Sequence, residues 1–318
     1  MASPAKPAIG LILLLALAPV LPAAGDETAW LERIETTPVS AATATAALAL
    51  GTAWLRDGDW EAASEALQEA LEVAVELDET AVATRAGQLL SAIHRLHLRP
   101  IGGSGPWRTA RVFQPRGLTL KKPAGVAARG DGELLVVDEN LDLVIAVTLG
   151  GAIDRRWSVA RAERPSWSPT GEVQVETRTG LRELTAATAP AADATAAPAG
   201  TRGDRVVDVA RDNAGDWWVL KRDPVLIRMS RGGAPLGSVA LPDMRRPAAL
   251  SVDALGNQYV LDRGEKRVIV LRRTGGVLAT LGPSLPGGVE LSRPVDIAVD
   301  QTGRLFIADT SRGLLVLE

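Results

Sequence analysis

The sequence predicts a mainly β fold built from repeated four-stranded units, preceded by a small α-helical domain. A stretch of about forty residues recurs along the C-terminal two thirds of the chain, and apolar residues before it follow a helical spacing. The last repeat holds only three apolar runs, and a matching run stands at the opposite end of the same region. These observations predict a ring of about five blades, a β-propeller, that is closed by an N-terminal strand.

The repeat is clearest at residues 294–317, where Asp and Gly turns separate three apolar runs. Repeats are predicted to start at Pro123, Pro165, Val206, Pro247 and Pro294, in steps of 42, 41, 41 and 47 residues. A glycine stands nine residues after four of the starts, at Gly132, Gly215, Gly256 and Gly303. An aspartate stands fifteen residues after three of them, at Asp138, Asp262 and Asp309. We interpret these aspartates as turn-forming strand ends rather than as ligands.

The second repeat departs most from this pattern. Its turn glycine, Gly171, follows Pro165 by only six residues, and its third apolar run leads into an Ala/Thr/Pro-rich segment at residues 185–201. That composition is typical of a solvated insertion.

The fourth strand of the last blade is predicted to come from residues 107–113. The last repeat stops at Glu318 after its third run, whereas other repeats continue into a fourth apolar run. Pairing residues 107–113 with the third run would close the ring and leave no open sheet edge at the join. The propeller domain is therefore expected to span residues 107–318.

Residues 1–25 have the pattern of a secretory signal peptide. Lys6 gives a basic start, residues 9–21 form an apolar run interrupted by Pro19, and small residues follow it. The run is shorter than the roughly 20 apolar residues that a membrane span needs. We therefore expect cleavage, no stable membrane span in the mature chain, and export to the periplasm or the extracellular space.

Residues 26–99 are predicted to form an α-helical domain, and a Gly/Pro-rich linker follows at residues 100–106. A helix is expected to end at Gly58, the next to be capped by Asp59, and a third to run from Glu79 to Leu98. A more specific pattern is carried by Leu50-Gly51, Trp54, Gly58-Asp59-Trp60, Ala63, Leu67 and Ala70-Leu71. It resembles one tetratricopeptide (TPR) repeat, although Val75 stands where that family has a proline.

The two domains differ in charge. Residues 26–100 carry 13 acidic and 5 basic side chains, whereas residues 107–318 carry 25 and 29. The helical domain is therefore acidic and the propeller weakly basic, which supports their separation into two units.

The blade sequences resemble NHL repeats. The resemblance rests on the starts Pro-Ala-Gly-Val-Ala, Val-Val-Asp-Val-Ala, Pro-Ala-Ala-Leu-Ser-Val-Asp and Pro-Val-Asp-Ile-Ala-Val-Asp, and on the later Val-Val-Asp, Val-Leu-Asp and Ile-Ala-Asp. Pro-Ser-Trp-Ser-Pro-Thr-Gly at Pro165 instead resembles blade starts of Tol-associated propellers. NHL propellers usually have six blades, whereas five are visible here. Some NHL proteins bind RNA, which the predicted export and the modest charge disfavour here.

The residue inventory predicts no catalytic, cofactor or metal site. The chain has no cysteine, and its two histidines, His94 and His97, stand at an expected solvated helix end without a third metal ligand. A Ser/His/Asp triad or a zinc lyase would need a histidine in the propeller, which has none. A calcium lactonase uses Glu, Asn and Asp oxygens, and the propeller's asparagines all stand in turn positions. Enzymatic activity is left open, and a binding role is favoured.

A base precedes every predicted blade start, at Lys122, Arg164, Arg205, Arg246 and Arg293. On the loops that lead into the innermost strands, these side chains would ring one mouth of the central channel. They could dock an anionic partner. Alternatively, each base bonds to loop carbonyls or to acids such as Asp208 and Asp296.

These observations predict an exported, non-enzymatic scaffold protein that binds a protein partner through a propeller face and the TPR-like segment. If the ring of bases forms part of the binding face, the partner is expected to be anionic. Two alternatives stay open: a metal-dependent propeller hydrolase or lactonase, and a binding module for anionic cell-envelope glycan. Nucleic acid is not expected as a partner.

Overall fold

The computed structural model describes residues 40–98, 106–130, 132–168, 171–178, 180–184, 205–241 and 243–318. The predicted signal peptide, most of the predicted linker and the predicted insertion at 185–201 lie outside these residues. The chain divides into two units, Met1–Leu98 and Arg99–Glu318, and each is described by itself. In the described part of the chain, no helix is both long and apolar enough to cross a membrane.

In its described residues, the first unit contains three α-helices and a π-helical turn: α3 (Ala41–Asp57), α4 (Trp60–Glu76), α5 (Thr80–Ile93) and η1 (His94–Leu98). Helix α3 ends at Gly58, whose φ of 82° suits a residue without a Cβ. Asp59 caps α4, because its Oδ1 accepts a hydrogen bond from the amide of Ala62 at 3.0 Å. The predicted helix boundary at Gly58-Asp59 is confirmed.

Helices α3 and α4 pack closely at Gly51. A Cβ at this position would lie 2.7 Å from Leu67 Cγ and 3.2 Å from the Ala63 carbonyl oxygen, so a larger residue would push the helices apart. The sequence predicts a solvated helix end at His97, and this prediction is wrong for its ring. The ring stacks on Trp60 with 3.8 Å between centroids. A helical hairpin with a third helix is thus present, and its assignment as a tetratricopeptide repeat remains a prediction.

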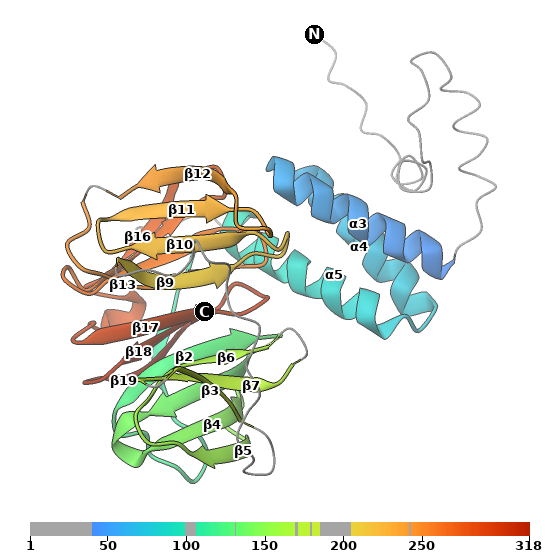
Figure 1. The fold of residues 1–318 in the computed structure, drawn as a ribbon. Coiled ribbons are helices and arrows are strands. Elements are labelled where there is room, and N and C mark those ends of the chain that lie inside the picture. The colour runs from blue at the N-terminus through green and yellow to red at the C-terminus, as the bar shows by residue number, and fades with distance from the viewer. Residues whose placement is uncertain are drawn as a thin grey trace, which may run out of the picture. The chain divides into compact units, whose positions relative to one another are not determined.

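The second unit is a five-bladed propeller, which confirms the predicted fold class (Figure 1). Each blade is one antiparallel sheet. The five sheets are β2 (Pro123–Arg129), β3 (Glu133–Asp138), β4 (Leu143–Thr148) and β5 (Ile153–Ser158); β6 (Ala162–Trp167), β7 (Val173–Thr177) and β8 (Gly180–Leu184); β9 (Val206–Arg211), β10 (Trp217–Lys221), β11 (Val225–Met229) and β12 (Pro235–Ala240); β13 (Pro247–Val252), β14 (Gln258–Asp262), β15 (Arg267–Leu271) and β16 (Val277–Leu281); and β17 (Pro294–Val299), β18 (Leu305–Asp309) and β19 (Gly313–Leu317) with β1 (Ala110–Phe113). Two 3-10 turns, η2 (Glu139–Leu141) and η4 (Pro286–Gly288), lie between strands.

Strand β1 closes the ring as predicted. It pairs antiparallel with β19, from Ala110 opposite Leu317 to Phe113 opposite Leu314. Arg108 and Thr109 continue the pairing, because both amides donate to the carbonyl oxygen of Glu318. The last blade therefore takes its outer strand from the other end of the domain, and the edge of β19 is covered.

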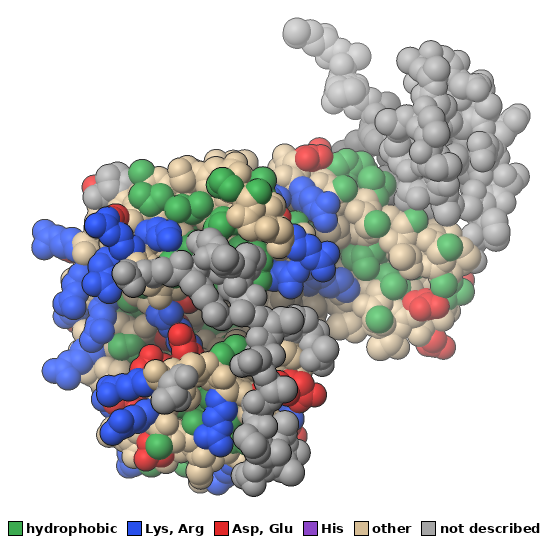
Figure 2. Space-filling model, viewed as in Figure 1, with side chains coloured by type: hydrophobic (Ala, Val, Ile, Leu, Met, Phe, Trp, Pro, Cys, Tyr) green, Lys and Arg blue, Asp and Glu red, His purple; other side chains and the backbone are tan. Residues whose placement is uncertain are grey.

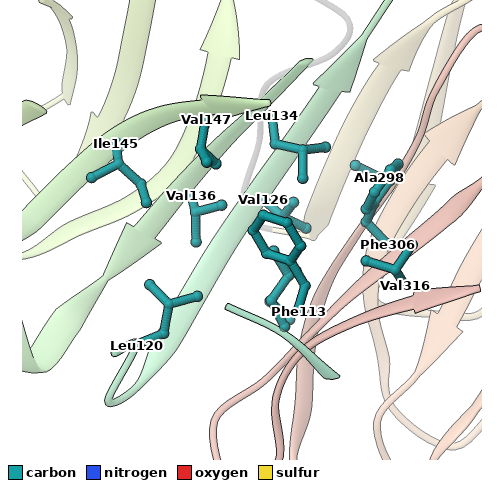
Figure 3. Packing of buried hydrophobic residues seen from close by; sticks show 12 residues of the cluster. Phe113, Leu120, Val126, Leu134, Val136, Ile145, Val147, Ala298, Phe306 and Val316 are labelled. Atoms are coloured by element: carbon teal, nitrogen blue, oxygen red, sulfur yellow. The ribbon is translucent and has the colours of Figure 1, made fainter. Parts of the chain in front are cut away.

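The core lies between neighbouring blades. Figure 3 shows buried side chains of β2–β4 facing those of β17–β19, with Phe113 of the closing strand among them. Similar apolar clusters join the β2–β5 sheet to the β6–β8 sheet and the β9–β12 sheet to the β13–β16 sheet. These clusters bury both faces of the β2–β5 sheet and one face of each of the other four sheets, as expected for blades packed around a propeller.

The innermost strands begin at one end of the ring, here called the start face, and lead to turns at the other end, here called the turn face. Four predicted starts coincide with the first residues of β2, β9, β13 and β17. The fifth is wrong: β6 begins at Ala162, and Pro165 lies inside it. Counted from Ala162, Gly171 is nine residues on and Thr177 fifteen, so this blade keeps the common spacing. The residue before the strand is therefore Arg161, not Arg164.

Candidate functional site

Three aspartates fix the backbone of the start face. Each of Asp138, Asp262 and Asp309 ends a second strand, and its carboxylate accepts four backbone amide bonds of 2.5–3.3 Å. Two of these amides belong to the loop before the innermost strand and two to the turn after the aspartate. A carboxylate with four such donors is a structural clasp. The donors include the amides of Lys122, Arg246 and Arg293, so the backbone of these three predicted binding residues is held in place.

The side chains of the predicted ring differ in their partners. Lys122 Nζ lies 2.7 Å from Glu139 Oε2, and the guanidinium of Arg205 pairs with Asp223. Arg246 and Arg293 are exposed, and no acid of the described residues forms an ion pair with either. Arg161, which takes the place predicted for Arg164, is also exposed.

Three further arginines lie on the start face, and the sequence pattern did not predict them as binding residues. Arg222, Arg263 and Arg312 stand in the turns between the second and third strands of their blades, are exposed, and have no ion-pair partner within the described ranges. The amides of Arg222 and Arg263 donate to the carbonyls of Arg205 and Arg246 at 2.7 and 2.9 Å, which brings the two sets of loops together. Aligning the residues after the fifteenth position of the repeat, as well as those before its start, would have found Arg222 and Arg263.

We call the five exposed and ion-pair-free arginines of three consecutive blades the cationic sector. Figure 2 shows Lys and Arg side chains gathered along the left edge of the propeller unit. Two acids of the neighbouring loops already have ion-pair partners: Asp223 pairs with Arg205, and Glu265 pairs with Arg245 at 2.8 Å. The members of the sector are Arg222, Arg246, Arg263, Arg293 and Arg312.

Arg164 points into the centre of the ring. Its Nη1 donates to the Val207 carbonyl at 2.8 Å and to Asp208 Oδ1 at 3.0 Å, and its Nη2 donates to the Ala248 carbonyl at 2.8 Å. Innermost strands leave backbone groups unpaired at the channel, and Arg164 satisfies two of their carbonyls. It thereby ties β6 to β9 and β13. Arg164 therefore follows the second of the two alternatives that the sequence leaves open for these bases: it bonds to backbone carbonyls and to Asp208.

Asp208 and Asp296 occupy the same repeat position as Arg164, two residues after the first residue of their strands. The amide of Leu250 donates to Asp208 and the amide of Val126 donates to Asp296, in each case from the innermost strand of the next blade. Burial raises the pKa of Asp296 to about 7, with Arg164 acting to lower it and Asp208 to raise it. Burial also raises the pKa of Asp208, which the nearby Arg164 opposes.

Gly125 holds this repeat position in β2 for a steric reason. A Cβ there would lie 2.1 Å from the Glu163 carbonyl oxygen and 2.8 Å from Pro165 Cδ. Pro165, which has no amide hydrogen, stands where Val126 and Leu250 donate to an aspartate in the other blades. A carboxylate at position 125 would therefore have neither space nor a donor.

The centre of the ring thus combines two carboxylates with one guanidinium. In the parts of the chain that the structure describes, no group of three or more His, Cys, Asp or Glu side chains comes together in a way that could hold a metal ion. The turn-face aspartates are occupied by their own turns, as shown by Asp253, which accepts from the amides of Leu255 and Asn257, the side-chain amide of Asn257 and the hydroxyl of Tyr259.

Comparisons with known proteins give matches among solved structures alone. No family model and no curated protein matches the sequence. Among solved structures, virginiamycin B lyase from Staphylococcus aureus is 13% identical with a TM-score of 0.32 over 65% of this chain and 73% of that one. A streptogramin B lyase is 14% identical with a TM-score of 0.31 over 65% and 71%. A protein of unknown function from Bacteroides thetaiotaomicron is 13% identical with a TM-score of 0.39 over 69% and 74%. At these TM-scores the likeness carries no argument about this chain, whose propeller fold rests on its own five sheets.

Proposed function

We propose that this protein is an exported docking protein whose start face binds an anionic protein partner. The observation that carries the proposal is the cationic sector: five exposed arginines on three consecutive blades, without acidic partners in the described parts of the chain. A guanidinium offers a planar fork of donors that matches carboxylate geometry, and unpaired bases of one sign attract an anionic surface.

Rigidity supports the same proposal. The amides of Arg246 and Arg293 are held by Asp262 and Asp309, and the amide of Arg312 is held by Asp309 as well. The backbone of these loops would therefore lose little conformational freedom on binding, and the cost of association falls mainly on the side chains. Loops fixed on a rigid scaffold are common positions for binding residues.

The test is quantitative capture with charge-matched variants. R246Q/R263Q/R293Q removes three members of the cationic sector, and R108Q/R156Q/R182Q removes three exposed arginines outside the start-face turns. We expect a protein from envelope extract that the wild type and the control variant retain and that the sector variant loses. Equal retention by all three proteins would overturn the proposal.

A second experiment distinguishes an anionic glycan ligand from a protein partner. Wild type and both variants are passed over a column carrying an anionic polysaccharide such as alginate. If the sector variant alone elutes early and no captured protein depends on the sector, the ligand is an anionic glycan rather than a protein. The test applies at a fixed, stated ionic strength because contacts between exposed charges weaken with salt.

A further inference from the structure

A second cationic position lies on the turn face, in a shallow pocket of about 290 Å³. The pocket lies between two turns of the β9–β12 sheet: the first turn, which joins β9 to β10, and the outer turn, which joins β11 to β12. The pocket is lined by Arg211, Asp212, Asn213, Ala214, Gly215 and Arg231. A Cβ on Gly215 would lie 3.3 Å from Arg211 Nη2 and 3.8 Å from Arg231 Cδ, so the two side chains flank the same glycine. Their charges have the same sign, which disfavours their closeness unless an anion offsets it.

The one acid that lines the pocket, Asp212, has its partners elsewhere: its Oδ2 lies 3.7 Å from Arg273 Nη1 of the next blade. The carboxylate of Asp212 accepts from the amides of Ala214 and Asp216 and from the indole of Trp218. Over the described ranges, neither Arg211 nor Arg231 forms an ion pair. Arg211 is positioned by its own turn, since its Nε donates to the Gly215 carbonyl at 3.3 Å and its guanidinium lies 5.6 Å from the centre of the Trp217 ring.

The next blade, the β13–β16 sheet, contains an arginine that can be compared with Arg231. Arg273 occupies there the same place in the outer turn as Arg231: the turns at Ser230 and Arg272 close with the same backbone bonds. Arg273 also lies against the equivalent glycine, with its Nη1 3.0 Å from a Cβ built on Gly256. Its Nη1 lies 3.7 Å from Asp212 Oδ2 of the preceding blade. In this blade the arginine of the outer turn thus pairs with an aspartate from the blade before it.

For Arg231 the matching residue of the preceding blade is Ser168. The first turn of that blade closes at Ser168 with the same backbone bonds as the turn at Asp212. Ser168 Oγ accepts from the amide of Glu172 at 3.0 Å, as Asp212 Oδ1 accepts from Asp216 at 3.0 Å. The serine keeps the turn bond but brings no charge. By repeat position, therefore, a neutral serine corresponds to the aspartate that Arg273 contacts in the next blade.

We propose that this pocket binds an oxyanionic group, such as phosphate, sulfate or carboxylate, between Arg211 and Arg231. The anion takes the place beside Arg231 that Asp212 has beside Arg273 in the next blade, and two guanidiniums supply bidentate donors for it. The site lies on the turn face and does not depend on the docking function proposed for the start face, so either can fail without the other.

Calorimetric titration of the purified protein with inorganic phosphate at low ionic strength tests the site. Arg231→Gln and Arg211→Gln are each expected to weaken binding about tenfold or more, equivalent to about 1.4 kcal/mol, whereas Arg156→Gln on an outer strand leaves it unchanged. Phenyl phosphate titrated in parallel distinguishes a free ion from an esterified group, because an ester site binds phenyl phosphate more tightly than the free ion.

Ser168→Asp provides the opposite test. An aspartate can keep the bond to the Glu172 amide and supply the missing carboxylate, so we expect phosphate binding to fall about tenfold or more while the protein stays folded. Unchanged phosphate affinity in Arg231→Gln would overturn the proposal, as would the absence of phosphate and phenyl phosphate binding in the wild type. Undiminished affinity in a folded Ser168→Asp protein would overturn the argument from the repeat.

Discussion

Arg164 Nη1 lies 3.0 Å from Asp208 Oδ1 and joins the innermost strand of one blade to that of the next. The same guanidinium donates to the carbonyls of Val207 in β9 and Ala248 in β13, so this side chain links its own strand, β6, to two other innermost strands. The nearby Asp296 also interacts electrostatically with Arg164 and with Asp208. The centre of the ring is therefore a charge network in which removal of the cation leaves buried carboxylates without a counterion.

Arg164→Met should destabilise the propeller strongly. Loss of one partner of a buried ion pair typically costs about 3–5 kcal/mol, because the remaining charge stays buried. The Arg164 side chain is 31% exposed, so we expect a loss at or below the lower end of this range. Urea unfolding followed by circular dichroism measures the difference. Arg161→Met, three residues away and exposed, is the matched control and should change stability by no more than about 0.5 kcal/mol. Similar midpoints for the two variants would contradict the bridging role of Arg164.

Stability should decrease as the pH rises from about 4 to about 7. The pKa of Asp296 is raised from 3.8 to about 7 in the folded protein, so within this range the folded state binds more protons than the unfolded chain. The free energy of unfolding therefore falls with rising pH. Burial raises the pKa of Asp253 to about 6, which adds to the same trend. Asp296→Asn should lower the slope and isolate its share, and parallel pH profiles for wild type and variant would speak against it.

The closing strand should show an alternation of effects along its length. Phe113 is 2% exposed in the core between two blades, so Phe113→Ala is expected to cost about 3–5 kcal/mol. Val112 is 47% exposed, and Val112→Ala should have little effect on the denaturant midpoint. Chemical denaturation of both variants tests the register of β1 on β19, and a larger loss for Val112→Ala would show that the register is wrong.

Asp309→Ala should destabilise the last blade by about 2–4 kcal/mol. Its carboxylate accepts four amide bonds, and hydrogen bonds to charged groups contribute more than neutral ones. Asp154→Ala, at an exposed carboxylate on an outer strand, serves as the control. Thermal unfolding of the two variants compares them, and an equal effect would mean that the clasp at Asp309 does not hold the start-face loops.

Most of the fold could be predicted from the repeat because spacing along the chain reports turn geometry directly. Starts at Pro123, Val206, Pro247 and Pro294 coincide with strand starts, and the closing strand was found from a missing fourth run. The second blade misled the prediction because Pro165 resembles a strand-initiating proline. It lies instead where a backbone amide would otherwise donate, and counting back nine residues from Gly171 gives the true start at Ala162.

The candidate sites were less predictable because they depend on which bases find partners in space. Lys122 and Arg205 pair with acids in nearby loops, whereas Arg246 and Arg293 do not, and no spacing rule separates these outcomes. The sequence predicts Arg164 at the mouth of the channel because it takes Pro165, rather than Ala162, as the start of the second blade, a shift of three residues. The bridge that it forms joins residues more than forty positions apart, and only the folded ring brings them together.

The most direct test of the docking proposal is the affinity of the captured partner for the protein, measured with and without the cationic sector. For the wild type and R108Q/R156Q/R182Q we expect equal affinity that weakens with added salt, because exposed charges are screened. For R246Q/R263Q/R293Q we expect an affinity lower by about tenfold or more, equivalent to about 1.4 kcal/mol. Binding by the sector variant that is as tight as that of the wild type, with the same dependence on salt, would contradict the account.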